Sequence, residues 1–246
     1  MSDPLAHVTP RRGFLGRLAA AGAALAGGGV VARGLGAQAP APAQPPAPRA
    51  GAAWDMSWVD RVKGAHRQVF DAPDLVDATV LHQARVWMSG YAEVYGTKDA
   101  DMSAVLVIRH AAIPMVLNDA LWDRAQVGKA LAEAEDGKVV LRDPATGELP
   151  RRNPFLNANT KADDRHSMLW PDGGLDTLIA RGAIVLACNL ALRRAIALVQ
   201  RADKVPTDEA RKTVLANLVP GVIVMPSGIF AVTRAQEAGC QYIRAS

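Results

Sequence analysis

Between Gly182 and Asn189 the chain reads Ala183-Ile184-Val185-Leu186-Ala187-Cys188, a run with no charged side chain and a single thiol at its end. A strand with one buried face alternates apolar and polar residues, whereas this run is apolar on both faces. The runs Ala104-Val105-Leu106-Val107-Ile108 and Val222-Ile223-Val224-Met225 share this property. Strands of this kind are typical of parallel sheets that helices cover on both sides.

Amphipathic stretches separate the apolar runs, so strands and helices alternate along the chain. Shorter runs at 68–70 and 240–243 predict a first and a last strand. Helices are expected at about 75–95, 114–131, 175–181, 190–200, 207–218 and 228–238. We therefore predict a single α/β domain over residues 54–246, a three-layer α/β/α sandwich with a mostly parallel sheet of about five strands.

Three residues mark expected helix ends. Pro114 suits the first turn of a helix, because a proline has no N–H to leave unpaired there. Gly182 suits the end of a helix. The Ser227 hydroxyl can accept a hydrogen bond from the exposed first-turn N–H groups of the last helix.

An inserted excursion at 133–170 interrupts the alternation. Asp143-Pro144-Ala145-Thr146-Gly147-Glu148 is a turn sequence, and 151–165 is polar and rich in asparagine. The excursion is expected to lie on the surface as a hairpin and an ordered loop. Its apolar residues either contact other subunits or cover the protein's own core; they are Phe155, Met168, Leu169 and Trp170.

The first 39 residues indicate an export signal. Arg11 and Arg12 precede Phe14-Leu15, and a weakly apolar Ala/Gly run follows at 18–31. This arrangement resembles a twin-arginine signal, which implies an export machinery that carries folded proteins and a periplasmic or secreted location. Cleavage is expected between residues 37 and 43, and 40–53 reads as an Ala/Pro-rich linker. No later segment is long and apolar enough to span a membrane, so no membrane is expected for the mature protein.

The charge distribution argues against nucleic-acid binding. The chain has 246 residues, with 28 basic and 24 acidic side chains. Residues 1–49 hold five of the arginines and one aspartate, which leaves 23 residues of each sign in the remainder. A nucleic-acid interface would need a basic patch on the folded part. Two cysteines are also too few for a disulfide scaffold or a four-cysteine metal site.

Candidate site residues follow the predicted strands, because ligands of open parallel sheets bind beyond the carboxyl ends of the strands. Helix N-termini at this edge favour anions. The rule selects the following residues: Asp71, Arg109, His110, Cys188, Asn189, Ser227 and Gly228.

Each of these residues also has an interpretation without a function. Cys188 is either a thiol activated by the following helix N-terminus or a buried structural cysteine. His110 either handles protons and anions or packs, hydrogen-bonded, at a strand–helix corner. Asp71 either faces a ligand or forms a turn with Pro73.

No cofactor motif is present in the right context. The chain has no P-loop, no dinucleotide-binding fingerprint and no Gly-x-Ser-x-Gly nucleophile elbow. A metal site built from some of His66, His82, His110 and His166 is an alternative, although no pair has close ligand spacing. No cofactor or metal is therefore expected. We also predict no disulfide between Cys188 and Cys240, because parallel strands would place them at opposite edges of the sheet.

Two stretches resemble the DsrE/DsrF-like sulfur-relay family. Residues 178–192 are similar to the family's pattern of a glycine, a hydrophobic run and Cys-Asn, here Cys188-Asn189. Residues 219–228 are similar to its Pro-Gly-Val…Pro-Ser-Gly strand, and 239–244 to its ending, with Cys240 and Arg244 in place of common residues. The resemblance covers about 68–245 without the excursion. It implies an α/β/α sandwich, assembly into homo-oligomers and, for some members, a persulfide on the cysteine at position 188.

These observations lead to a predicted function and an alternative. The prediction is an exported sulfur carrier or sulfane-sulfur-binding protein in which Cys188 accepts sulfur and Arg109 and His110 assist with small sulfur anions. The alternative is a non-enzymatic periplasmic module that binds a small anion at the strand ends or assembles into an oligomer.

Overall fold

The computed structural model describes residues 54–75, 78–134, 141–143, 146–159 and 169–245. The predicted signal at 1–39 and linker at 40–53 lie outside these residues, as do Met168 and His166. No helix of the described part is long and apolar enough to cross a membrane.

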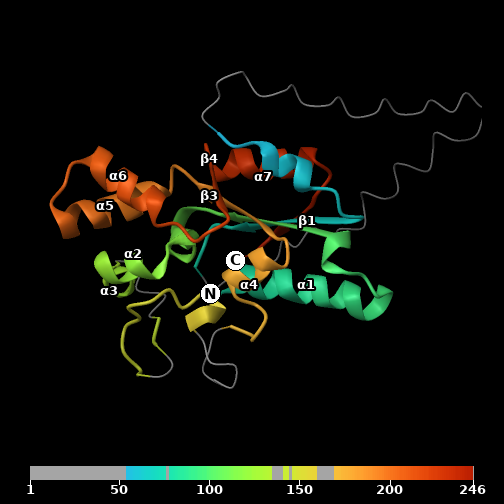
Figure 1. Ribbon diagram of the computed structural model, residues 1–246, viewed down its shortest axis with the longest axis horizontal. Helices are drawn as coiled ribbons and strands as arrows, with labels where there is room; N and C mark the ends of the chain where they lie inside the picture. The colour runs from blue at the N-terminus through green and yellow to red at the C-terminus, as the bar shows by residue number, and fades with distance from the viewer. Residues whose placement is uncertain (1–53, 76–77, 135–140, 144–145, 160–168, 246) are drawn as a thin grey trace, which may run out of the picture. The chain divides into compact units, whose positions relative to one another are not determined.

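The central element is a five-stranded sheet with the order β4-β3-β2-β1-β5, in which all four pairs of neighbouring strands are parallel (Figure 1). This confirms the predicted α/β class and the number of strands. The strands are β1 (His66–Ala72), β2 (Met102–Ile108), β3 (Ile184–Cys188), β4 (Val222–Met225) and β5 (Gln241–Arg244).

Helices lie on both faces of the sheet, as the three-layer prediction requires (Figure 1). The face with α1 has the larger core, and α7 and the 3-10 helix η3 cover the other. The α-helices are α1 (Thr79–Tyr95), α2 (Asp119–Arg124), α3 (Val127–Ala132), α4 (Leu175–Ala180), α5 (Leu192–Asp203), α6 (Thr207–Ala216) and α7 (Gly228–Glu237). The 3-10 helices are η3 (Ser57–Arg61), η4 (Asp99–Asp101), η5 (His110–Val116) and η6 (Asn157–Asn159).

Alternate residues of the central strands enter different cores, because successive side chains of a strand point to opposite faces. Val105 and Val107 of β2 pack in the core beneath α7, whereas Leu106 and Ile108 pack in the core beneath α1. Both sets are buried. The runs had to be apolar throughout for this reason.

The expected helix at 114–131 is wrong. Pro114 lies inside η5, and α2 and α3 follow as two separate helices. The Asn118 side chain accepts a hydrogen bond from the Leu121 N–H at 3.0 Å and so begins α2 as an N-cap. Gln126 has a left-handed φ of 48° and separates α2 from α3.

Part of the excursion belongs to the core of the domain. Phe155 and Leu169 are buried in the cluster beneath α1, so these two residues cover the protein's own core. Asn153 is fully buried, and its side-chain amide donates to the carbonyl oxygens of Met115 and Leu117 at 2.9 and 2.6 Å. Although the segment is polar in composition, these three buried residues attach it to the core of the domain.

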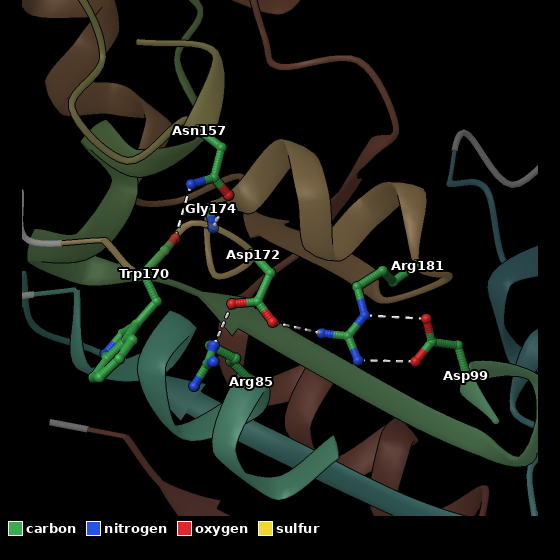
Figure 2. Close-up of polar contacts among 7 residues, drawn as sticks. All are labelled: Arg85, Asp99, Asn157, Trp170, Asp172, Gly174 and Arg181. Carbon is green, nitrogen blue, oxygen red and sulfur yellow. Dashed lines mark hydrogen bonds and ion pairs between the residues drawn. The ribbon is translucent and has the colours of Figure 1, made fainter. Parts of the chain in front are cut away.

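A polar network fixes the return of the excursion to the domain (Figure 2). Asp172 pairs with Arg85 of α1, and Arg181 forms two hydrogen bonds with Asp99 at 2.9 and 3.0 Å. The second Asp172 oxygen lies 4.0 Å from Arg181 and connects the two pairs. The Arg85 guanidinium also lies 4.8 Å from the centre of the Trp170 ring. This cation–π contact holds the half-exposed tryptophan against α1.

Asn157 closes the base of the same loop (Figure 2). Its side-chain amide donates to the Trp170 carbonyl oxygen at 2.9 Å, and its side-chain oxygen accepts from the Gly174 N–H. A Cβ at Gly174 would lie 2.4 Å from the Asn157 nitrogen. A glycine is therefore required where the loop meets α4.

Candidate functional site

Three of the predicted site residues meet at the carboxyl edge of the sheet. Asp71 is in β1, Arg109 directly follows β2, and Cys188 ends β3. The register pairs Ile108 with Ala187, which places Arg109 and Cys188 next to each other on adjacent strands. Each of these residues lies two positions after a residue of the core beneath α7, namely Val69, Val107 and Leu186, so their side chains share the face that α7 covers.

Asp71 and Arg109 form a bidentate ion pair. Arg109 donates from Nε to Oδ1 at 2.6 Å and from Nη2 to Oδ2 at 2.9 Å. The Asp71 carboxylate is nearly inaccessible, whereas about a quarter of the Arg109 side chain is exposed. The predicted turn of Asp71 with Pro73 is therefore wrong: Asp71 lies inside β1 and binds an arginine that is 38 residues away.

Tyr242 of β5 completes this group. Its hydroxyl donates to Asp71 Oδ2 at 3.0 Å. Burial and this hydrogen bond raise the pKa of the Tyr242 phenol. The sequence analysis did not select Tyr242, because only the pairing of β5 with β1 brings it to Asp71.

Gly228 gives Arg109 the space to reach Asp71. A Cβ at Gly228 would lie 2.5 Å from Arg109 Cδ and 2.7 Å from Arg109 Cβ. The arginine side chain thus passes directly over the first residue of α7. Ser227 caps this helix, as predicted, by accepting a hydrogen bond from the Phe230 N–H at 3.1 Å.

Cys188 lies beside the arginine with 6% of the residue exposed. Hydrogen bonding to Asp71 is the main cause that raises the pKa of Arg109; burial opposes it, and the charges of Asp71, Tyr242 and Cys188 add to it. The helix after Cys188 begins at Leu192, two residues later than expected, so three residues separate Cys188 from α5. The intervening turn is closed by a hydrogen bond from the Ala191 N–H to the Cys188 carbonyl oxygen at 3.0 Å.

The Asn189 side chain contacts another part of the protein, whereas we predicted that it binds a ligand. Its side-chain oxygen accepts a hydrogen bond from Arg211 of α6 at 2.7 Å, and its N–H donates to the Met225 carbonyl oxygen at 2.9 Å. The residue therefore fixes the turn after Cys188 to β4 and α6. Arg211 lies on a helix distant in sequence, and the sequence analysis did not select it.

His110 is exposed and has a left-handed φ of 49°. The interpretation as a packed, hydrogen-bonded corner residue is wrong, because the imidazole has no hydrogen bond to any described residue. Left-handed backbone is uncommon outside glycine, and histidine tolerates it better than most residues.

Cys240 is as buried as Cys188, with 5% exposed. Burial raises the pKa of the Cys240 thiol to about 11, and the charge of Arg67 lowers it in part. Both cysteines are free. β1 and β2 lie between the strands of Cys188 and Cys240, and this is the topology from which we predicted no bridge.

A metal cluster is absent from the described residues, where no group of three or more histidine, cysteine or acidic side chains lies together. Of the four histidines that we considered, His66 instead contacts the ring of Tyr91 and His82 stacks near Trp170. His166 is outside the described part.

Fold and site together define an α/β protein with a buried Asp–Arg pair and a cysteine at the carboxyl edge of a parallel sheet. Comparison with family models and with curated proteins gave no match. Among solved structures, the chain is similar to MTH1491, a protein of unknown function from Methanobacterium thermoautotrophicum, with 16% identity and a TM-score of 0.34. The similarity covers 73% of this chain and 98% of that one. At this level it says nothing about activity, and the resemblance to the DsrE/DsrF-like family rests on the sequence motifs.

Proposed function

We propose that the protein is a DsrE-like sulfur carrier in which Cys188 accepts sulfane sulfur. The observation that supports this most is the position of Cys188, next to a partly exposed arginine at the edge of the sheet where ligands of parallel α/β folds bind. The neighbouring guanidinium can bind an anionic sulfur donor beside the thiol that is to be loaded.

Arg109 retains a donor for a ligand. Nε and Nη2 bind Asp71, whereas Nη1 makes no hydrogen bond to a described residue. The bidentate pair fixes the plane of the guanidinium, so Nη1 has a defined direction. The N-terminus of α7 adds positive potential at the same place. Both features favour a small anion beside Cys188.

The proposed reaction needs no external oxidant. The Cys188 thiolate attacks a terminal sulfane sulfur of an inorganic polysulfide, and a new S–S bond forms as one S–S bond of the polysulfide breaks. A polysulfide that is one sulfur shorter leaves with the electron pair. Arg109 would hold the anionic outer sulfur of the persulfide until the thiolate of an acceptor attacks it. The small exposed area of Cys188 favours a slender donor over a bulky one.

The test uses the full chain and sodium tetrasulfide, followed by mass spectrometry of the intact protein and its peptides. We expect a gain of one sulfur atom on Cys188 that dithiothreitol reverses. Cys188→Ser should abolish the gain. Cys240→Ser is a matched control, because Cys240 is equally buried and burial raises the pKa of its thiol to about 11. Sulfur on Cys240 alone, or an unmodified Cys188, would contradict the proposal.

His110 is proposed to assist at the rim of the site, because its imidazole is exposed and directly follows Arg109. His110→Gln should slow sulfur loading, since an exposed imidazole can donate a hydrogen bond to a polysulfide anion. An equal rate for both proteins would exclude this role.

The location is proposed to be periplasmic or secreted, on the basis of the Arg11-Arg12 pair and the apolar run that follows it. In a bacterium with a twin-arginine machinery, the full chain should be found outside the cytoplasm. Replacing both arginines with lysine should retain it inside. Export that is unaffected by the replacement would contradict a twin-arginine route.

A second candidate function is assembly of copies of this chain, with or without a bound small anion. Leu190, Ile229 and Phe230 follow neighbouring strands at the carboxyl edge, and all three are exposed. Exposed apolar residues that gather in one region often mark interfaces. Sedimentation velocity should show an oligomer that Ile229→Glu dissociates. A monomer at all concentrations would exclude this function.

A further inference from the structure

A hollow lies between η5, α3 and α5, and the sulfur proposal does not involve it. Its inner part is a cavity of about 380 Å3, which is within the range of small-molecule sites. Apolar side chains form most of its lining: Ile113, Leu117, Val127, Leu131 and Leu198. Such a lining favours an apolar group and offers little to a free inorganic ion.

A larger outer cavity of about 710 Å3 is contiguous with the inner one. The two share Ala130, Ala134, Leu198 and Arg201 in their linings. Arg124 and Lys129 also line the outer cavity, where Glu133 is the one acidic residue among the described lining residues. The two cavities thus have opposite character: one is apolar, and the other is cationic.

The cationic charge of the hollow is only partly compensated. Arg124 pairs with Asp203 at 2.9 Å, and Lys129 pairs weakly with Glu133 at 3.8 Å. Arg201, which lines both cavities, has no acidic partner among the described residues.

Arg194 lines the inner cavity and also has no acidic partner in the described part of the chain. It lies two turns before Arg201 on the same face of α5. Arg201 stands at the junction of the cavities, where an anion could pair with it while an attached chain remains in the apolar part.

We propose that the two cavities form one binding site for a single-chain amphiphile with an anionic head, such as an alkyl carboxylate. The chain would fill the inner cavity against Leu131 and Leu198. The head would lie at the junction and pair with Arg201. A neutral apolar ligand would leave the cations unused, and a small anion would leave the apolar lining exposed to water.

The first test compares ligands on the unaltered full chain by isothermal titration calorimetry, below micellar concentrations. We expect decanoate to bind at least tenfold more tightly than decyltrimethylammonium, which has the same chain and the opposite charge. Acetate, which has the head without the chain, should give no heat. Equal binding of the two amphiphiles, or no binding of decanoate, would overturn the proposal.

The second test changes the protein. Arg201→Gln should weaken decanoate binding by roughly tenfold, the loss expected for one charge-assisted hydrogen bond. Arg193→Gln is the matched control, because Arg193 is exposed on the same helix and lines neither cavity. Cys188→Ser should bind decanoate normally, since the two sites are separate. Equal losses in the Arg201 and Arg193 variants would show a non-specific charge effect and refute the site.

Discussion

Gly228→Ala tests whether the Asp71–Arg109 pair depends on the glycine beneath it. The new Cβ would lie 2.5 Å from Arg109 Cδ, so the arginine must leave its position. Asp71 then keeps only the hydrogen bond from Tyr242. Breaking a fully buried pair costs about 3–5 kcal/mol. Arg109 is partly exposed and alanine favours the helix by up to about 1 kcal/mol, so we expect a net loss of about 1–3 kcal/mol.

The assay is urea unfolding at pH 7, where a loss of this size lowers the midpoint by roughly 0.5–1.5 M. Gly90→Ala is the control: nothing lies within 4 Å of its added Cβ, and it should stabilise α1 by about 0.5–1 kcal/mol. Asp71→Asn should cost less stability in the Gly228→Ala background than in the unaltered protein, because the carboxylate there has already lost its arginine. A Gly228→Ala protein as stable as the unaltered one would refute the argument.

Three further predictions concern stability. Between pH 9 and about 11 only the folded protein holds the Cys240 proton, so the free energy of unfolding should fall with rising pH by about 2–3 kcal/mol. In urea melts Cys240→Ala should flatten this dependence on pH, and an unchanged slope would contradict the prediction. Ser227→Ala removes the cap of α7 and should cost about 1 kcal/mol in thermal unfolding, whereas Ser227→Asp should cost little. Asp172→Asn removes the charge that connects Arg85 and Arg181, and it should lower the free energy of unfolding by only about 0.5–1 kcal/mol because the network is half-exposed. The same variant should be cleaved faster by proteases near Trp170, and unchanged cleavage would mean that the network does not fix the loop.

The centre of the sheet was predictable because β2, β3 and β4 are apolar on both faces, and this pattern depends on local sequence alone. The ends of the strands differed: β1 and β2 extend beyond the predicted runs, and β3 and β5 each begin one residue later. The division of the expected helix after Pro114 was also readable, because Asn118-Asp119 is an N-cap signal.

The partners of the site residues were not predictable in the same way. Asp71 meets Arg109 and Tyr242 only when β1 is between β2 and β5, and the strand order is not encoded locally. Asn189 similarly finds Arg211 through the packing of α6. The edge rule for parallel sheets selected residues of which Asp71, Arg109 and Cys188 lie at one edge of the sheet, whereas the choice between a ligand contact and an internal contact required the tertiary arrangement.

The position of β1 has a consequence for biosynthesis. This strand is made early, yet one of its two neighbours, β5, is the last element of the chain. The indole N–H of Trp58 similarly donates to the sulfur of Met225, which lies 167 residues later in the chain, at 3.2 Å. An amino-terminal fragment can complete neither the sheet nor the α7 layer. The domain can therefore acquire its native packing only after β5 has been made, and any ribosome-bound intermediate that lacks β5 exposes one side of β1 as an unpaired edge that chaperones can recognise.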